Sequence, residues 1–474
     1  MILRRALAGA LSLLAVTSAP AAAQFTPGAA GGGDPFFPSA GNGGYDVQSY
    51  AVKLDYDAQN EQLAGDVTIA ARATQDLSSF NLDLLGFNVS TVTVNGAAAT
   101  FARKDQELTV RPASGLARNT DFTARIVYAG HVNNVRDPDH ARDGWIPTED
   151  GAYVANEPQG VPSWLPVNDS LKDFATWDFQ VTVPQGRTVM ANGVLVSKTD
   201  SGGKTTWHWR ETSPMVSYLA TATNGVFELR TSTLANGLPR YDAVDPQTRY
   251  YGEKTPRPQD AWDTLAIEPE AVDFLSNLYG PYPFEAVGGV VDWAPNVFFA
   301  LETQTKPLYD VLPDELTVVH ELAHQWFGDA LVLDHWSDMW LNEGFATWSE
   351  WIWTERHGGQ TAQQRFNQLY ARSEDSRSGQ DLWFPAPDAL PGPADLFGTP
   401  VYDRGAMTLQ ALRAKIGNDN KFIRILRTWY AENRYSNVTT DEFIATAESV
   451  SGMQLDHFFD VWLFQAGRPE PGSW

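Results

Sequence analysis

The chain has 474 residues, no cysteine, and 58 acidic against 34 basic residues, which gives a formal net charge of −24. Its length leaves room for two or three domains with sizeable cores. The absence of cysteine excludes disulfides and thiol chemistry, and so acidic a chain repels nucleic acid and anionic membrane surfaces. We therefore expect neither nucleic acid nor a membrane as a partner.

Residues 1–23 have the pattern of an export signal. Two arginines precede an apolar run from Ala6 to Val16, and three alanines before Gln24 offer a cleavage site. The run is too short to span a bilayer, and no later stretch reaches the apolar length of a membrane helix. We expect a soluble, exported protein, and the two destinations, periplasm or extracellular space, share this kind of signal.

Residues 24–44 are rich in Gly, Pro and Ala and are predicted to form a flexible linker. From Tyr45 to about residue 240, short alternating segments are separated by turn signals such as Asn95-Gly96. Strands are expected at 47–56, 65–73, 80–85, 89–94, 108–110, 122–128, 176–183, 188–196, 205–210 and 226–229. No helical pattern here is long enough for a βαβ unit. Residues 45–240 are therefore predicted to form an N-terminal antiparallel β domain.

After about residue 240 the pattern becomes helical, and residues 241–474 are predicted to be mostly α, so that the whole chain is α+β. A helix from Glu268 to Tyr279 is expected to stop at Gly280-Pro281. Another, from Asp314 to Phe327, has Pro313 at its start and a glycine after its end. Further helices are expected at 341–357, 362–372, 406–416, 418–432, 440–450 and 455–465.

The stretch H-E-L-A-H at residues 320–324 predicts a metal site. Residues four apart lie on one face of a helix, so His320 and His324 can direct two imidazoles at one metal ion. Glu321 would lie beside the metal, as a carboxylate that takes a proton from the attacking water. Catalytic zinc takes three protein ligands and keeps one open position. Glu343, with eighteen residues between it and His324, is the candidate third ligand.

The H-E-x-x-H stretch, with N-E-G-F-A at 342–346, resembles the aminopeptidase N family of zinc metallopeptidases, which includes the leukotriene-epoxide hydrolase. Three more motifs follow the family's order: N-E-P-Q-G at 156–160, F-A-L-E-T at 299–303 and Y-D-R-G-A at 402–406. The resemblance runs from Tyr45 to the C-terminus. It implies a thermolysin-like zinc peptidase domain with one Zn²⁺ per chain, in a short form without the family's C-terminal helical domain.

The same resemblance implies roles for individual residues. Glu321 is the general base, and the Tyr402 hydroxyl donates to the oxyanion of the tetrahedral intermediate. Glu302, helped by Glu157, holds the protonated amine of the substrate. Phe299 stands where the family usually has Gly, and Thr303 replaces the usual Asn; a bulky Phe changes how closely a substrate backbone can approach. The chain is thus expected to be an aminopeptidase acting on peptides with a free N-terminus.

Two other functions remain open at this point. An open cleft would admit internal peptide bonds and make the chain a zinc endopeptidase, although Glu302 and Glu157 argue against it. A non-catalytic peptide-binding scaffold would be expected to lack metal ligands or the general base, and all of these are present. Nothing in the sequence indicates an oligomeric state.

Overall fold

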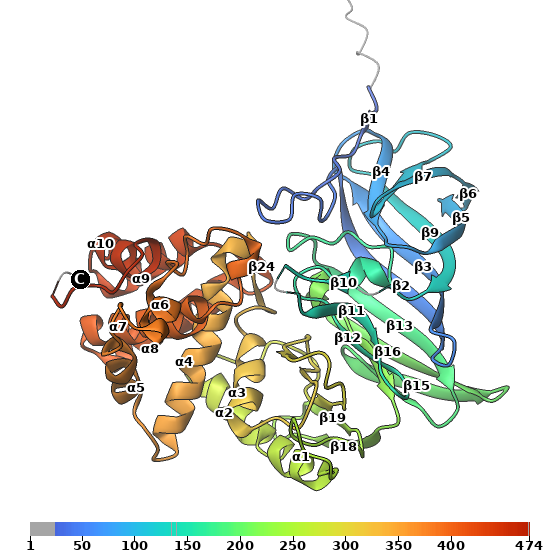
Figure 1. Cartoon of the computed structure of the whole chain (residues 1–474). Coiled ribbons are helices and arrows are strands. Elements are labelled where there is room, and N and C mark those ends of the chain that lie inside the picture. Colours follow the sequence, from blue (N-terminus) through green and yellow to red (C-terminus); the bar gives the residue numbers. More distant parts are fainter. Residues whose placement is uncertain (1–23, 134, 139, 473) are drawn as a thin grey trace, which may run out of the picture.

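The computed structural model describes residues 24–133, 135–138, 140–472 and 474. A β-sheet half and a helical half lie side by side (Figure 1). This confirms the predicted α+β architecture, with the β domain first. The expected export signal at residues 1–23 lies outside the described residues.

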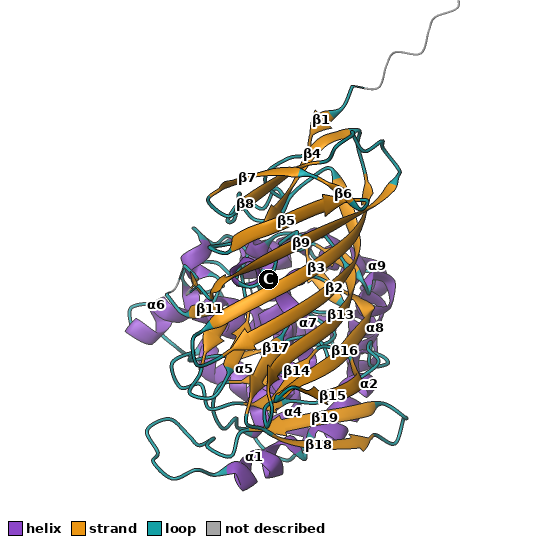
Figure 2. Ribbon diagram, turned by 90° about the vertical axis from the view of Figure 1, so that its right-hand side faces the viewer, coloured by secondary structure: helices purple, strands orange, loops and turns teal. Residues whose placement is uncertain are grey.

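An eight-stranded sheet forms the largest layer of the β half (Figure 2). Buried and exposed residues alternate along its long strands, because successive side chains point to opposite faces. In spatial order the strands are β15 (Val194–Ser201), β16 (Lys204–Met215), β13 (Ala175–Pro184), β2 (Tyr45–Asp57), β3 (Gln62–Ala73), β9 (Asp121–His131), β5 (Asn88–Val94) and β6 (Ala97–Ala98).

The β half forms the predicted antiparallel β domain, with one pair of long strands as an exception. Strand β13 lies parallel to β2, with Phe179 opposite Val52. A long connection separates the two strands in sequence, so no hairpin fixes their relative direction. Alternation within a strand does not reveal the direction of its neighbour.

Two smaller sheets complete this half. One has the order β1 (Thr26–Pro27), β4 (Leu77–Asp83), β8 (Glu107–Arg111) and β7 (Thr100–Lys104). The other has the order β10 (Val135–Arg136), β11 (Arg142–Pro147), β12 (Ala152–Ala155), β17 (Ala222–Gly225) and β14 (Thr188–Ala191). The strand expected at 188–196 is thus two strands in different sheets, β14 and β15. Gly193, at φ 78°, takes the left-handed conformation at the break between them.

The segment 24–44 packs against both halves, contrary to the expected flexible linker. The Gly28 backbone N–H donates to the Ser79 carbonyl at 2.8 Å. Phe37 is buried and meets the Trp336 ring edge-on. The Asp34 carboxylate accepts from the backbone N–H of Trp336 at 2.9 Å. The composition did not reveal this packing, because most of the segment's hydrogen bonds come from backbone groups, which any residue supplies.

A five-stranded sheet belongs to the helical half. Its order is β18 (Glu228–Thr233), β19 (Pro239–Val244), β20 (Val290–Val291), β22 (Leu308–Tyr309) and β21 (Ala300–Leu301). The domain boundary expected near residue 240 falls inside β19. Strand β18 pairs with β19, and β19 pairs with β20, which follows residue 280. The sheet therefore places the change of half between β17 and β18. The sequence gives no sign of this, since both strands continue the preceding β pattern.

The helices of the second half are α1 (Pro258–Leu265), α2 (Glu268–Tyr279), α3 (Glu315–His324), α4 (Trp340–Arg356), α5 (Ala362–Tyr370), α6 (Arg377–Trp383), α7 (Gly405–Ile416), α8 (Asp419–Asn433), α9 (Thr440–Ser451) and α10 (Asp456–Phe459). Helices α1 and α3 contact this sheet, and the other helices of the second half extend away from it (Figure 1). Two π-helical segments, η5 (Pro400–Arg404) and η6 (Asp460–Phe464), adjoin α7 and α10. The predicted helix 455–465 therefore divides into α10 and η6. Among the described residues, no helix combines the length and the apolar content needed to cross a bilayer.

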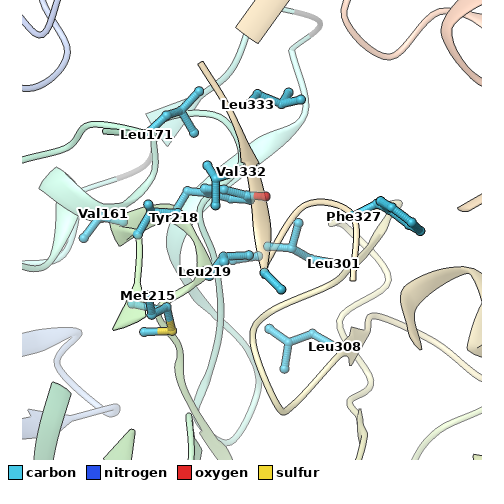
Figure 3. Close-up of a cluster of buried hydrophobic side chains, with 14 of the residues drawn as sticks. Val161, Leu171, Met215, Tyr218, Leu219, Leu301, Leu308, Phe327, Val332 and Leu333 are labelled. Carbon is cyan, nitrogen blue, oxygen red and sulfur yellow. The ribbon is translucent and has the colours of Figure 1, made fainter. Parts of the chain in front are cut away.

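Buried apolar side chains from both halves meet in one cluster, which we call the seam (Figure 3). The β half contributes residues near the short helical turns η1 (Val161–Ser163) and η2 (Ser217–Leu219). The helical half contributes residues of β21 and β22, the turn after α3, and strand β23 (Leu331–Leu333), which pairs with β24 (Ser436–Val438). The side chains labelled in Figure 3 are Val161, Leu171, Met215, Tyr218, Leu219, Leu301, Leu308, Phe327, Val332 and Leu333. The seam fixes the β half against the segment that carries the metal motif.

Candidate active site

Helices α3 and α4 pack together and bring three candidate metal ligands to one point. His320 Nε2 lies 3.0 Å from Glu343 Oε2, and His324 Nε2 lies 3.4 Å from the same oxygen. Asp314 caps α3, because its carboxylate accepts from the Thr317 N–H at 2.8 Å. Helix α3 ends at His324 and is thus shorter than the predicted 314–327 helix. Both imidazoles lie on one of its faces.

The second nitrogen of each imidazole is held by an acceptor. Glu350 Oε1 lies 2.6 Å from His320 Nδ1, and the Phe327 carbonyl accepts from His324 Nδ1 at 3.0 Å. Such bonds fix the ring orientation and leave both Nε2 atoms facing Glu343. Glu350 was not predicted from the sequence, although it follows Glu343 by seven residues, which is about two turns of one helix.

The electrostatics of this group favour a positive charge between its members. Burial alone would raise the pKa of Glu343, but His324 and His320 hold it at about 2. Burial alone would lower the pKa of His324, but Glu343 and Glu302 raise it to about 9. The same negative surroundings favour a divalent cation, and two imidazole nitrogens with one carboxylate are a donor set that catalytic zinc uses. The residues present therefore fit zinc.

Glu321 lies beside the three candidate ligands. One of its carboxylate oxygens is within 4.8 Å of ligand atoms of both Glu302 and His324. Burial raises the pKa of Glu321 to about 8, against the lowering effect of His320 and His324. The carboxyl group is thus placed to exchange a proton next to the three candidate metal ligands.

Tyr402 lies on η5 and faces the imidazole of His320. Its ring lies nearly parallel to the His320 imidazole, with the centroids 6.0 Å apart. Burial, followed by the charge of Glu343, raises the pKa of Tyr402 well above its usual value. The hydroxyl therefore keeps its proton at neutral pH and can donate it in a hydrogen bond.

Glu302 and Glu157 come from different halves and line the same cavity. The Tyr218 hydroxyl, from the β half, donates to Glu302 Oε1 at 3.0 Å, and Gln325 Nε2 donates to the Glu302 carbonyl at 2.8 Å. Glu157 is buried, and its Oε1 has no hydrogen-bond partner among the described residues. An unpartnered buried carboxylate oxygen indicates a place for a cationic ligand.

Neither Tyr218 nor Gln325 was predicted from the sequence. Gln325 directly follows the second histidine, which could have drawn attention to it. Tyr218 gives no local signal, because its bond to Glu302 spans 84 residues.

All of the predicted site residues line one cavity of about 730 Å³. Its described lining contains seven carboxylates and neither lysine nor arginine. The predicted residues found there are Glu157, Glu302, His320, Glu321, His324, Glu343 and Tyr402. The arrangement can hold one metal ion, a proton acceptor, a hydroxyl donor and a cationic group.

Comparisons with known proteins cover nearly the whole described chain. The model of the Peptidase family M1 domain matches residues 295–462, and that of the Peptidase M1 N-terminal domain matches residues 46–219. The crystal structure of the M1 zinc metallopeptidase from Deinococcus radiodurans is 30% identical, with a TM-score of 0.81, over 93% of this chain and 99% of that chain. Similar structures include a mutant of that enzyme bound to a Tyr-Ser-Ala substrate and a two-domain M1 zinc metallopeptidase mutant bound to L-arginine.

Curated relatives are longer than this chain. Aminopeptidase N of Streptomyces lividans is 24% identical over 459 residues, which are 90% of this chain and 51% of the relative. Aminopeptidase M1-C of Oryza sativa subsp. japonica is 26% identical over 336 residues, which are 64% of this chain and 36% of the relative. The chain spans between about a third and about half of the length of these two relatives. The resemblance to the aminopeptidase N family is confirmed, and the chain belongs to the peptidase M1 family of zinc metallopeptidases.

Proposed function

We propose that the protein is a zinc aminopeptidase that hydrolyses the N-terminal peptide bond of peptides. The observation that carries this proposal is the placement of Glu302 and Glu157 beside the H-E-x-x-H group in one cavity. A carboxylate pair at this place binds a protonated amine close to the reacting bond. The names of the relatives, aminopeptidases in both curated cases, support the same activity.

His320, His324 and Glu343 would hold one Zn²⁺ in this proposal. When bound, zinc supplies Lewis-acid polarisation of the carbonyl and lowers the pKa of water. Glu350 and the Phe327 carbonyl keep the two imidazoles in the orientation that binding requires.

Glu321 is the proton carrier. Its carboxylate accepts a proton from the water that attacks the carbonyl carbon and passes that proton to the nitrogen of the departing amine. The Tyr402 hydroxyl donates a hydrogen bond to the oxyanion that forms on the substrate. Glu321 is buried and Tyr402 is partly buried, so these contacts are made largely away from bulk water, where electrostatic effects are stronger.

Glu302 and Glu157 set the position of the cut. Tyr218 and Gln325 hold Glu302 from two sides, so the bound amine stays at a fixed distance from Glu321. Related enzymes have been crystallised with a tripeptide substrate and with a free amino acid, which supports peptides as the substrate class.

The test is hydrolysis of fluorogenic amino-acid amides, run beside N-acetylated copies, with the wild type and Glu321→Gln. We expect activity on the free-amine substrates only, abolished by a chelator and restored by zinc. Glu321→Gln should lower kcat by about 10²- to 10⁴-fold with its zinc content unchanged, because Glu321 moves a proton and is not a ligand.

The zinc content, measured by mass spectrometry, separates the possible failures. Equal cleavage of the acetylated substrates would contradict the role of Glu302 and indicate an endopeptidase. Inactivity of the wild type with one zinc bound would favour a non-catalytic scaffold.

A further inference from the structure

Phe298 lines the active-site cavity in an unusual state for a large apolar residue. Its side chain is 71% exposed. Its φ is +77°, in the left-handed region, which a residue with a side chain adopts only at a cost in free energy. Because the ring is exposed, burial of apolar surface does not offset this cost. We therefore look for a ligand that the ring could contact.

The surroundings of Phe298 hold it in place. The Asp310 carboxylate accepts from the Phe298 backbone N–H at 2.8 Å and also from the Tyr251 hydroxyl. The Tyr251 ring stacks on the Phe298 ring, with the centroids 5.7 Å apart and the planes 19° apart. The exposed ring is therefore a rigid surface, with one face covered by Tyr251 and the rest available to a ligand.

Helix α3 gives the direction of a bound peptide. Glu302 lies beside His324, near the C-terminal end of this helix. Leu316 lines the cavity four residues before His320, which is one turn nearer the other end of α3. With a rise of about 1.5 Å per residue, Leu316 and His324 are separated by about 12 Å along the axis. A peptide with its amine at Glu302 and its first carbonyl at Glu321 therefore continues toward Leu316.

The chain before Glu302 leads away from the amine site as well. Phe298 precedes Glu302 by four residues, and the intervening β21 lies against α3. Four extended residues span up to about 13 Å. Phe298, Phe299 and Leu316 all line the cavity, and Leu316 is 37% exposed. Apolar surface thus lies beyond the reacting bond, whereas carboxylates surround the amine.

We propose that Phe298, with Phe299 and Leu316, forms a binding site for a large apolar side chain on the residue that follows the scissile bond. This proposal rests on the proposed aminopeptidase function and names the substrate class more closely: peptides whose second residue is aromatic or branched aliphatic. The ring of Phe298 is the specificity-determining group. Its left-handed backbone places the ring in the cavity, and Tyr251 and Asp310 keep it there.

The test uses tripeptides Leu-Xaa-Ala with Xaa as Gly, Ala, Leu or Phe, and the initial rate of leucine release. We expect wild-type kcat/KM to favour Xaa = Phe over Gly by at least about tenfold, the range that apolar pockets provide. Phe298→Ala should reduce this ratio to about threefold or less, because it should lower kcat/KM more for Xaa = Phe than for Xaa = Gly. Phe298→Leu should retain an intermediate ratio.

Phe101→Ala is the matched control, because Phe101 is also an exposed aromatic residue, on β7, and does not line the cavity. It should keep the wild-type ratio. A wild type without preference would overturn the proposal, and so would a Phe298→Ala variant that slows all four substrates equally.

Binding to Glu321→Gln, measured by calorimetry on the zinc-loaded protein, tests the site without turnover. Leu-Phe-Ala should bind at least about fivefold more tightly than Leu-Gly-Ala, and the added Phe298→Ala change should abolish that difference. Equal affinities of Leu-Phe-Ala and Leu-Gly-Ala for Glu321→Gln would overturn the proposed apolar site but not the proposed aminopeptidase function. Cleavage of N-acetylated tripeptides would instead overturn the proposed aminopeptidase function.

Discussion

Glu350 acts on the metal group through His320. Its Oε1 lies 2.6 Å from His320 Nδ1, and the carboxylate fixes the ring and increases its basicity. Glu350→Gln should lower zinc affinity by about 10- to 100-fold, because a neutral amide supports the imidazole less well. Competition with a chromogenic chelator measures this change.

Glu355→Gln provides the comparison for that experiment. Glu355 lies on the same helix, α4, and bonds to the Ala362 N–H instead of a candidate ligand. Its replacement should leave zinc affinity unchanged. A Glu350→Gln variant with wild-type affinity would show that the His320 orientation does not depend on this carboxylate.

The π-helical segment η5 carries Tyr402 and is anchored by one buried arginine. Arg404 donates to the carbonyls of Trp462, Trp383, Val461 and Gln465, so it joins η5 to the ends of η6 and α6. Such carbonyls carry partial negative charge, which a guanidinium stabilises. The geometry of Tyr402 is therefore set by the C-terminal segments of the chain.

Arg404→Met should lower the free energy of unfolding by about 3 to 5 kcal/mol, because it leaves buried carbonyls without donors. Arg413→Met should cost about 1 kcal/mol or less, since Asp419, the partner of Arg413 in this ion pair, is 68% exposed and the pair is open to solvent on that side. Urea denaturation of both variants measures the difference. Equal losses would mean that the carbonyl contacts of Arg404 add little to stability.

At the scale of the whole molecule, two buried aspartates near the seam link stability to pH. Burial raises the pKa of Asp169 and of Asp173 to about 7. The Ser217 hydroxyl donates to Asp169 at 2.7 Å, and the Val47 N–H donates to Asp173 at 2.9 Å. These bonds partly support the ionised forms but do not offset burial.

The sign of this effect follows from the two states. The folded state binds protons more tightly than the unfolded chain, whose aspartates have a pKa near 3.8. Stability is therefore lost as the pH rises from about 4 to about 7 and then levels off, by up to about 4 kcal/mol per group. Relative to the wild type, the variant with both Asp169→Asn and Asp173→Asn should become more stable as the pH rises from 5 to 8.

Urea denaturation at several pH values tests this expectation. Asp121→Asn is the control, because Asp121 is exposed and Arg72 lowers its pKa. Its difference from the wild type should stay constant over the same range. A constant difference for the double variant would refute the coupling.

Local patterns explain how much of the molecule the sequence revealed. The H-E-x-x-H spacing lies within one helix, and Glu343 lies in the first turn of another, so short-range periodicity was enough to find them. The resemblance then supplied Glu302, Glu157 and Tyr402 from motifs that have no geometric signal of their own. Their places in the cavity come from the structure, whereas their roles stay predictions.

Long-range contacts explain what the sequence did not reveal. The bond of Tyr218 to Glu302 depends on how the halves meet, and the parallel pairing of β13 with β2 depends on a distant strand. The packing of segment 24–44 depends on the Trp336 region of the other half. None of these leaves a period or a spacing in the sequence.

Because of the seam, the proposed amine site and the candidate metal site are held by different parts of the molecule. The proposed amine site combines Glu157 and Tyr218 from the β half with Glu302 from the helical half, whereas the candidate metal ligands belong to α3 and α4 alone. A small rotation of one half against the other would move Glu157 and Tyr218 relative to Glu302 and so weaken binding of the substrate's amine. The candidate metal ligands would keep their positions relative to one another. If the proposed function holds, substitutions in the seam, far from the reacting bond, should change how strictly the enzyme requires a free N-terminus.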